Sequence, residues 1–287
     1  MRGKLKKLFA AVLAVLLALS FSGCSELTGL DAQALMSPPK TTADREAIYA
    51  LMGGGVGDVT LVYPKYGDYR SAIISRDLDG CGTSEVVSFC ANGDAGGTRL
   101  EFFKKNTDGV WSSMARFTSA ATQVDKVFFG DLTGDGMDEI IVGWGDPLTA
   151  TASVSVYYVD GDTIREFSMT TVSYSEMLLT DFDSDNIKEL FVLQAAQTSG
   201  EEIMALGGLY RFDGDQPYVS KTVPLDAAVT RYTSVSFSQV NSWRRAAVLD
   251  GVKADGHMLT QVIGYDEASD RLISPLSNEE NATDRPT

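Results

Sequence analysis

The sequence predicts an all-β fold made of about four repeat units of roughly 50 residues each. From about Asp58 onward, short apolar runs alternate with turns rich in glycine, aspartate and asparagine, and no long amphipathic helical pattern interrupts them. A loop rich in acidic residues recurs at matched spacing, and a strand–turn–strand pattern follows each copy of that loop. Together these observations predict four strands in each unit.

The chain begins with the pattern of an export signal, in residues 1–23. Four basic residues precede an apolar run at residues 8–19, which is too short to span a membrane comfortably. The signal ends in Phe-Ser-Gly-Cys at residues 21–24, which resembles the lipobox of bacterial lipoproteins. The resemblance implies that Cys24 is lipidated and anchors the protein to the outer face of a bacterial cell membrane. The alternative is an ordinary signal peptide followed by a chance cysteine.

The charge of the chain argues against nucleic acid as a partner. Removal of residues 1–23 takes away four positive charges and lowers the formal net charge from −15 to −19. Contacts to phosphates require lysine and arginine, so an exported chain of this charge is a poor nucleic-acid binder. Strong acidity suits the binding of cations, although it also keeps a surface protein soluble.

The segments that flank the repeats carry weaker signals. Residues 24–57 predict a tether followed by a short helix at 43–52, which three glycines end. Residues 277–287 are predicted to form a polar tail. The two cysteines of the repeats, Cys81 and Cys90, allow a disulfide in principle. The strand expected between them disfavours it, because an extended strand holds its ends too far apart.

The recurring loop places oxygen-bearing side chains at four fixed positions. When the first acid is position 1, these residues fall at positions 1, 3, 5 and 9, and the loops begin 54 and then 50 residues apart. They are Asp77, Asp79 and Glu85 in the first loop, Asp131, Thr133, Asp135 and Glu139 in the second, and Asp181, Asp183, Asp185 and Glu189 in the third. A fourth copy keeps the apolar frame but has Gln239, Asn241, Trp243 and Ala247 at these positions. The apolar frame therefore defines the unit, and the acids are an addition to it.

The apolar frame and the turns place the units near residues 69–118, 124–169, 175–224 and 232–275. Each unit offers an incoming strand, the loop, an outgoing strand and a hairpin, which is the pattern of a four-stranded propeller blade. We therefore expect β-propeller repeats over residues 58–276. An extra strand at residues 59–64 would complete the last blade and close the ring; alternatively, the chain forms part of a larger propeller.

The acid-rich loops predict a site for Ca²⁺. Crowded carboxylates repel one another unless a cation joins them, and Ca²⁺ takes about 6–8 oxygen ligands. Position 7 would contribute only its backbone carbonyl, so its side chain can differ between loops. The residues at that position are Thr83, Met137 and Ile187. The loops are not EF-hands, because position 12 is Ser88, Val142 or Val192 instead of glutamate. The alternative is that the acids only form turns, which aspartate favours.

The pattern resembles the FG-GAP/VCBS-type repeats of integrin-like β-propellers, in which a Ca²⁺ loop joins the first two strands of a blade. The resemblance covers about residues 69–275 and rests on the three acid-rich loops. It implies a propeller that Ca²⁺ stabilises. Cys81 replaces an oxygen ligand in the first loop, the third loop has the fullest set of acids, and the fourth is expected to bind no Ca²⁺.

The sequence contains no recognisable catalytic set. His257 is the only histidine, which excludes zinc chemistry of the HExxH type, and no nucleophile elbow accompanies it. We therefore expect a non-catalytic, lipid-anchored cell-surface protein that binds an extracellular protein or glycan. The alternative is an enzyme, or the accessory subunit of one, that acts on extracellular polymers through one face of a propeller.

Overall fold

The computed structural model describes residues 42–55, 57–146, 151–167, 172–199, 202–213, 216–239 and 245–281. The predicted signal peptide, Cys24 and the tether up to residue 41 lie outside these ranges, as do Asn241 and Trp243 of the fourth loop. The chain divides into two compact units, Met1–Glu46 and Ala47–Thr287, and the second contains the strands described below. Within the described ranges, no helix has the length and apolarity to cross a membrane.

The predicted short helix is present as α3 (Ala43–Leu51). Gly53 follows it with a φ of 97°, a left-handed conformation that glycine adopts at no steric cost. Ile48 and Met52 are 4% and 2% exposed and belong to one apolar cluster with Phe103 of the first sheet. The end of the helical segment thereby covers one face of that sheet.

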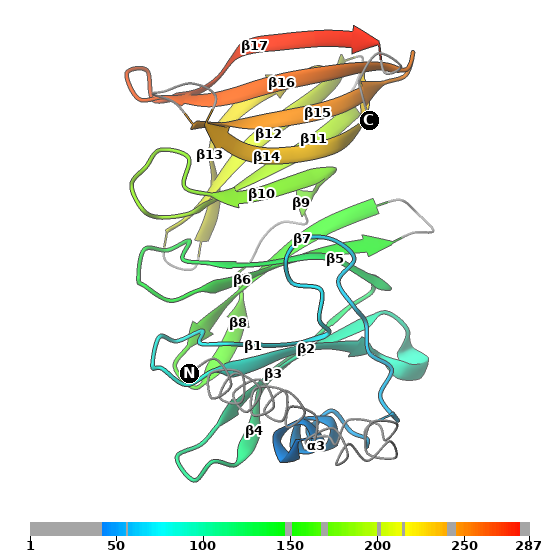
Figure 1. Cartoon of the computed structure of the whole chain (residues 1–287), viewed down its shortest axis with the longest axis vertical. Helices are drawn as coiled ribbons and strands as arrows, with labels where there is room; N and C mark the ends of the chain where they lie inside the picture. The colour runs from blue at the N-terminus through cyan, green and yellow to red at the C-terminus, as the bar shows by residue number, and fades with distance from the viewer. Residues whose placement is uncertain are drawn as a thin grey trace, which may run out of the picture. The chain divides into compact units, whose positions relative to one another are not determined.

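Four antiparallel sheets follow one another along the chain, and the four main strands of each sheet pair in sequence order (Figure 1). The first contains β1 (Ile73–Arg76), β2 (Glu85–Ala91), β3 (Thr98–Lys105) and β4 (Trp111–Ser119), and the short 3-10 helix η2 (Gly93–Ala95) lies between β2 and β3. The second contains β5 (Gln123–Gly130), β6 (Glu139–Asp146), β7 (Thr151–Asp160), β8 (Thr163–Glu166) and β9 (Val172–Ser173), which pairs with β7. The third contains β10 (Glu176–Thr180), β11 (Glu189–Ser199), β12 (Glu202–Asp213) and β13 (Gln216–Leu225). The fourth contains β14 (Val229–Gln239), β15 (Arg245–Lys253), β16 (His257–Asp266) and β17 (Arg271–Asn281).

The all-β class and the four units of four strands are thus confirmed, with β9 as an additional short strand. The last strand, β17, extends to Asn281, five residues into the segment predicted as a polar tail. Pairing explains the extension, because β16 offers a partner for each end of β17, up to the pair His257 and Asn281.

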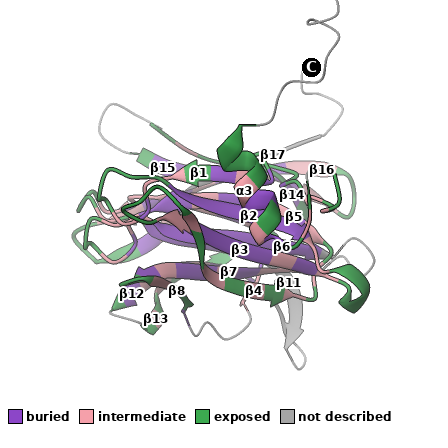
Figure 2. Ribbon diagram, turned by 90° about the horizontal axis from the view of Figure 1, so that it is seen from below, coloured by how far each residue is buried: buried purple, intermediate pink, exposed green. Residues whose placement is uncertain are grey.

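Burial on both faces explains why the second strand of a unit is almost wholly apolar. Every residue of β2 except the last is buried. Val87 and Phe89 face the second sheet, whereas Val86 and Cys90 contribute to the cluster beneath α3, as the period of two in a strand requires. Figure 2 shows this burial along β2 and β3. The described cysteines, Cys81 and Cys90, are both free thiols.

Apolar clusters join each sheet to the next one in the chain. Phe102 and Tyr157 lie in a cluster shared by the first and second sheets, and Ile141 and Leu190 in one shared by the second and third. A third cluster contains Phe191 and residues of the fourth sheet. Within the part of the chain that the structure describes, no such cluster joins the first sheet to the fourth.

The segment at residues 59–64 pairs with the first sheet, so the expectation that it completes the last blade is wrong. Leu61 forms an isolated antiparallel bridge with Cys90 of β2. The backbone N–H of Val62 donates to the carbonyl of Phe89 at 3.0 Å. The physical reason is that β2 extends beyond β1, which leaves backbone groups that require partners of their own.

Candidate functional site

The three acid-rich loops connect the first and second strands of the first three sheets, where the sequence predicts them. We call residues 77–85, 131–139 and 181–189 the first, second and third acid loops. All three share left-handed backbone conformations at positions 4 and 6. The φ values are 68° at Gly80, 86° at Gly82, 80° at Gly134, 85° at Gly136, 66° at Ser184 and 71° at Asn186. The loops therefore adopt one conformation, even where the third uses serine and asparagine in place of glycine.

The aspartate at position 1 holds the turn of each loop. The carboxylate of Asp131 accepts hydrogen bonds from the backbone N–H groups of Gly134 (2.6 Å) and Gly136 (2.9 Å). Asp181 accepts the same two bonds, from Ser184 (2.7 Å) and Asn186 (3.0 Å). Asp77 accepts the second of these bonds, from the N–H of Gly82 at position 6, at 2.9 Å. These acids thus form the turn as well as presenting carboxylates within it.

The glutamate at position 9 begins the second strand of its sheet and is buried in all three loops. One of its carboxylate oxygens accepts a hydrogen bond from the backbone N–H at position 2. The pairs are Glu85 with Leu78 (2.9 Å), Glu139 with Leu132 (2.7 Å) and Glu189 with Phe182 (2.8 Å). The three glutamates are only 3%, 2% and 1% exposed. Charged groups at such depth require compensation by hydrogen bonds or by positive charge.

The pKa values of these glutamates lie above the ordinary value, because burial disfavours the ionised carboxylate. Burial, followed by the negative charges of Asp135 and Asp131, raises the pKa of Glu139 to about 7. Burial and the nearby Asp183 likewise raise the pKa of Glu189 to about 7, and burial raises the pKa of Glu85. A cation in the loop would oppose these shifts, because it stabilises the ionised carboxylate.

Buried oxygens at the predicted ligand positions lack hydrogen-bond partners. Within the described residues, these atoms are Asp77 Oδ1, Thr133 Oγ1 and Asp183 Oδ1, one in each acid loop. Buried polar atoms are normally paired, so each of these oxygens has an unused acceptor site. Ligand atoms of Asp181, Asp183 and Glu189 lie within 4.8 Å of one another, as do those of Asp77, Asp79 and Cys81. Oxygen-rich sets of this kind suit a hard cation such as Ca²⁺, although the sulfur of Cys81 does not.

Position 5 also shapes the loop. Asp135 accepts a hydrogen bond from the N–H of Met137, and Asp185 accepts one from Ile187, both at 2.8 Å. The first loop has Cys81 here, and hydrogen bonding to that cysteine lowers the pKa of Asp79. Asp79 accepts a hydrogen bond from the N–H of Cys81 at 3.0 Å, so in the first loop the bond falls two positions earlier than in the other two loops.

Two of the side chains at position 7 are apolar and pack away from their own loop. Met137 packs against the apolar cluster between the first and second sheets. Ile187 lies against the second acid loop, where a Cβ added to Gly134 would come within 2.8 Å of it. In the first loop, the carbonyl of Thr83 lies 3.9 Å from the sulfur of Cys81. Met137 and Ile187 can therefore offer only their backbone carbonyls for coordination.

Position 8 joins neighbouring loops. The N–H of Asp138 donates to the carbonyl of Leu78 in the first loop (3.3 Å), and the N–H of Lys188 donates to the carbonyl of Asp131 in the second (2.9 Å). The side chain of Asp138 accepts a hydrogen bond from Nε of Arg76, a residue of β1, at 2.7 Å. The three acid loops thus form a connected row.

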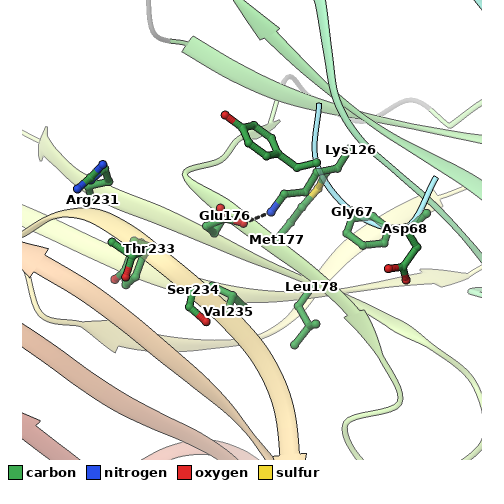
Figure 3. A pocket seen from close by; sticks show the side chains of 13 residues that line it. Gly67, Asp68, Lys126, Glu176, Met177, Leu178, Arg231, Thr233, Ser234 and Val235 are labelled. Carbon is green, nitrogen blue, oxygen red and sulfur yellow. Dashed lines mark hydrogen bonds and ion pairs between the residues drawn. The ribbon is translucent and has the colours of Figure 1, made fainter. Parts of the chain in front are cut away.

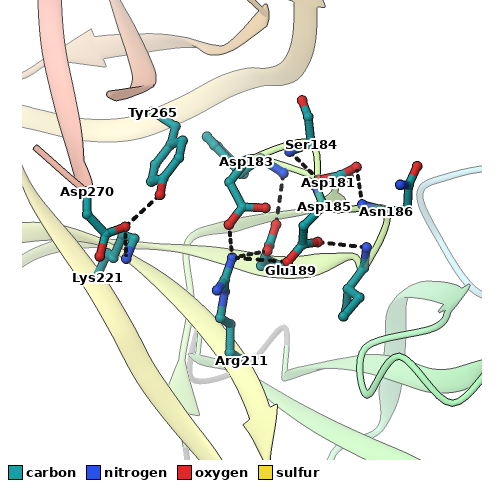
Figure 4. Close-up of polar contacts among 12 residues, drawn as sticks. Asp181, Asp183, Ser184, Asp185, Asn186, Glu189, Arg211, Lys221, Tyr265 and Asp270 are labelled. Carbon is teal, nitrogen blue, oxygen red and sulfur yellow. Dashed lines mark hydrogen bonds and ion pairs between the residues drawn. The ribbon is translucent and has the colours of Figure 1, made fainter. Parts of the chain in front are cut away.

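Arg211 of β12 reaches the third acid loop, which the sequence does not reveal. Its guanidinium forms ion pairs with Asp183 and Glu189, the latter at 2.6 Å, and lies 3.8 Å from Asp185 (Figure 4). Arg211 follows Tyr210, which pairs with Leu190 across the sheet, so it stands opposite the glutamate at position 9. Arg211 and Glu189 are 22 residues apart, and only the register of β11 and β12 brings them together. No pattern in the sequence gives that register.

A separate cavity of about 700 Å³ lies beside the first strands of the second, third and fourth sheets. Its wall includes an ion pair between Lys126 and Glu176, and Arg231 and Asp68 at its edges (Figure 3). Tyr232 also lines it. This residue is 7% exposed, and within the described part of the chain its hydroxyl has no hydrogen-bond partner. The cavity combines opposite charges, hydroxyl groups and apolar side chains, and its size is typical of a small-molecule site.

The chain matches no model of a known protein family and no curated protein. The resemblance to FG-GAP/VCBS-type repeats therefore stays a prediction from the sequence.

Proposed function

We propose that this chain is an exported lipoprotein whose four sheets are blades of a β-propeller, and that it binds an extracellular protein or glycan without catalysing a reaction. In this proposal, Cys24 carries the lipid that holds the protein at the outer face of the cell membrane. Ca²⁺ bound in acid loops fixes the edges of the blades. The observation that carries the proposal is the shared geometry of the three acid loops, with a buried glutamate and an unpaired buried oxygen in each.

In this proposal, Ca²⁺ binds in the first and second acid loops. Asp131, Thr133, Asp135 and Glu139 would hold the ion in the second loop, together with the carbonyl of Met137. Asp77, Asp79, Glu85 and the carbonyl of Thr83 would do so in the first. The bound ion would supply positive charge to carboxylates that otherwise only repel one another. Its role would be structural, because the ligands are already used to build the turn.

Thermal melting of the full chain in Ca²⁺ and in EGTA, at two pH values, tests this role. Extracellular Ca²⁺ sites with Kd of about 10⁻⁴–10⁻³ M would add about 0.4–1.4 kcal/mol each at about 1 mM Ca²⁺. The folded pKa of Glu139, about 7, lies above its ordinary 4.5. Protonation of Glu139 therefore stabilises the folded protein fully below the unfolded pKa, and this contribution is lost as the pH rises through about 7. We expect the Tm in EGTA to fall over this range, and the gain from Ca²⁺ to be larger at about pH 8 than at about pH 5.

Glu139→Gln is the matched control for this experiment. Glutamine keeps the acceptor for the N–H of Leu132 but cannot ionise, so the curve in EGTA should depend less on pH. The variant should also gain less from Ca²⁺ than the unaltered chain. An identical Tm in Ca²⁺ and EGTA at both pH values, with no binding heat in calorimetry, would contradict the calcium role.

The cavity beside the first strands favours a glycan over a protein as the partner. Its charged side chains are balanced in number, with Lys126 and Arg231 against Glu176 and Asp68. A neutral polyhydroxylated chain would find both donors and acceptors there, while Tyr66, which is 54% exposed, offers an aromatic face. The acidity of the whole chain makes a polyanionic partner less favourable.

A panel of neutral oligosaccharides, followed by calorimetric titration of any that bind, tests the binding function. We expect saturable binding that Tyr66→Ala weakens by about fivefold or more, since tyrosine is enriched among the few contact residues whose truncation costs over about 1 kcal/mol. Tyr218→Ala is the control, because Tyr218 is 47% exposed on β13 and does not line the cavity. Binding that Tyr66→Ala leaves intact would exclude this cavity. Turnover of a polymer by the purified chain would contradict a non-catalytic role.

A further inference from the structure

We propose that the third acid loop is closed by an intramolecular cation, the guanidinium of Arg211, in place of Ca²⁺. This inference rests on the proposed calcium role of the other two loops. It reverses the ranking that acid content alone suggests, because the third loop has the fullest set of carboxylates.

The contacts of Arg211 are those of a cation held inside the loop. One guanidinium nitrogen forms ion pairs with both Asp183 and Glu189 and lies 3.8 Å from Asp185. The side chains of Glu189 and Asp183 are 1% and 12% exposed, so this charge is largely removed from water. Burial lowers the pKa of Arg211, but hydrogen bonds to Asp183 and Glu189 outweigh burial and raise it above its ordinary value. The arginine therefore remains charged in this position.

The corresponding residues of the other sheets do not enter their loops in this way. The matching residue is the one opposite position 9. Because the strands are antiparallel, it comes directly after the residue that pairs with position 10. Val86 pairs with Phe103 and Ile140 pairs with Tyr157, which identifies Lys104 and Tyr158. Tyr158 carries no positive charge and stacks on Phe167, with ring centroids 4.4 Å apart. Lys104 forms its ion pair with Asp162, which lies outside the acid loops. Its charge contributes to lowering the pKa of Asp79, but among the described residues its ammonium forms no ion pair with a carboxylate of the first loop.

The guanidinium of Arg211, paired with two acids of the loop, distinguishes the third loop from the other two. Ca²⁺ at the same carboxylates would have to approach a fixed guanidinium or displace it, and either change costs favourable contacts between Arg211 and two buried acids. All three contacts come from one terminal nitrogen of the guanidinium, so its positive charge lies among the three carboxylates. Among the three loops, only the second has a full set of oxygen ligands and a neutral residue opposite position 9.

Calorimetric titration of the full chain with CaCl₂ tests the inference. We expect the unaltered chain to bind Ca²⁺ in the first two loops only, and Arg211→Gln to gain one further site. Arg165→Gln is the control, because Arg165 pairs with Asp160 at an exposed place outside the loops and should not change the number of sites. Asp185→Asn should leave the unaltered chain's Ca²⁺ binding unchanged but should remove the site gained by Arg211→Gln.

The outcomes separate this inference from the proposed function. If the unaltered chain binds no Ca²⁺ and Arg211→Gln gains a site, the role of Arg211 is supported and the calcium role of the other loops fails. If Arg211→Gln folds and gains no site, the inference is overturned. Should that variant fail to fold, a crystal structure of the unaltered chain in excess CaCl₂ decides. An ion in the third loop with Arg211 displaced overturns the inference, and Arg211 in place beside an ion-filled second loop supports it.

Discussion

Replacement of Asp131 by alanine is expected to abolish Ca²⁺ binding in the second acid loop and to lower the free energy of unfolding by about 2–4 kcal/mol. The carboxylate of Asp131 accepts hydrogen bonds from the N–H groups of Gly134 and Gly136, so the variant loses two charge-assisted bonds. It also loses a proposed ligand of the ion. Urea unfolding in Ca²⁺ and in EGTA measures both effects, the first as a difference between variants and the second as a difference between the two solutions.

Asp138→Ala is the matched control in the same loop. The side chain of Asp138 pairs with Arg76 and not with the groups around Asp131. Because both partners are partly exposed, its removal is expected to cost no more than about 1 kcal/mol and to leave the response to Ca²⁺ intact. A full Ca²⁺ response in Asp131→Ala, or its loss in Asp138→Ala, would show that the ligands have been assigned to the wrong side of the loop.

Phe102→Ala is expected to destabilise the protein by about 3–5 kcal/mol, because a large ring is removed from a packed core. Phe102 is fully buried in β3 and contacts Phe117 of its own sheet and Tyr157 of the second, with ring centroids 6.0 Å and 5.9 Å away. The substitution therefore tests the packing of one sheet on the next. Denaturant unfolding measures the loss.

An exposed aromatic residue provides the comparison for Phe102. Tyr218→Ala removes a ring that is 47% exposed, and a change within about 0.5 kcal/mol is expected. If Phe102→Ala costs less than about 1 kcal/mol under the same conditions, the first two sheets do not share the core described above.

The features that could be predicted from the sequence are local ones. Each acid loop lies between two apolar runs only a few residues away, so position 1 and position 9 are fixed relative to the strands that begin and end beside them. In the second loop, for example, Asp131 follows β5 directly and Glu139 begins β6. The fourth unit follows the same frame without the acids, and its β14 and β15 pair as the frame requires.

The features that could not be predicted depend on contacts between distant residues. Arg211 enters the third loop only because the register of β11 and β12 places it opposite Glu189. The segment at residues 59–64 has the composition of a strand, but its pairing with β2 depends on how far that strand extends beyond β1. Periodicity within a segment carries no information about either register.

The hydrogen bonds at position 8 have a consequence for how the sheets lose structure. In a repeat array, stability depends on each unit and on the coupling between neighbouring units. Here the N–H groups of Asp138 and Lys188 tie each acid loop to the one before it, beside the apolar contacts between sheets. An ion held in the second loop would therefore strengthen the coupling of the second sheet to both the first and the third. Loss of the ion would lower the cooperativity of unfolding along the chain, and its effect would not be confined to a single loop.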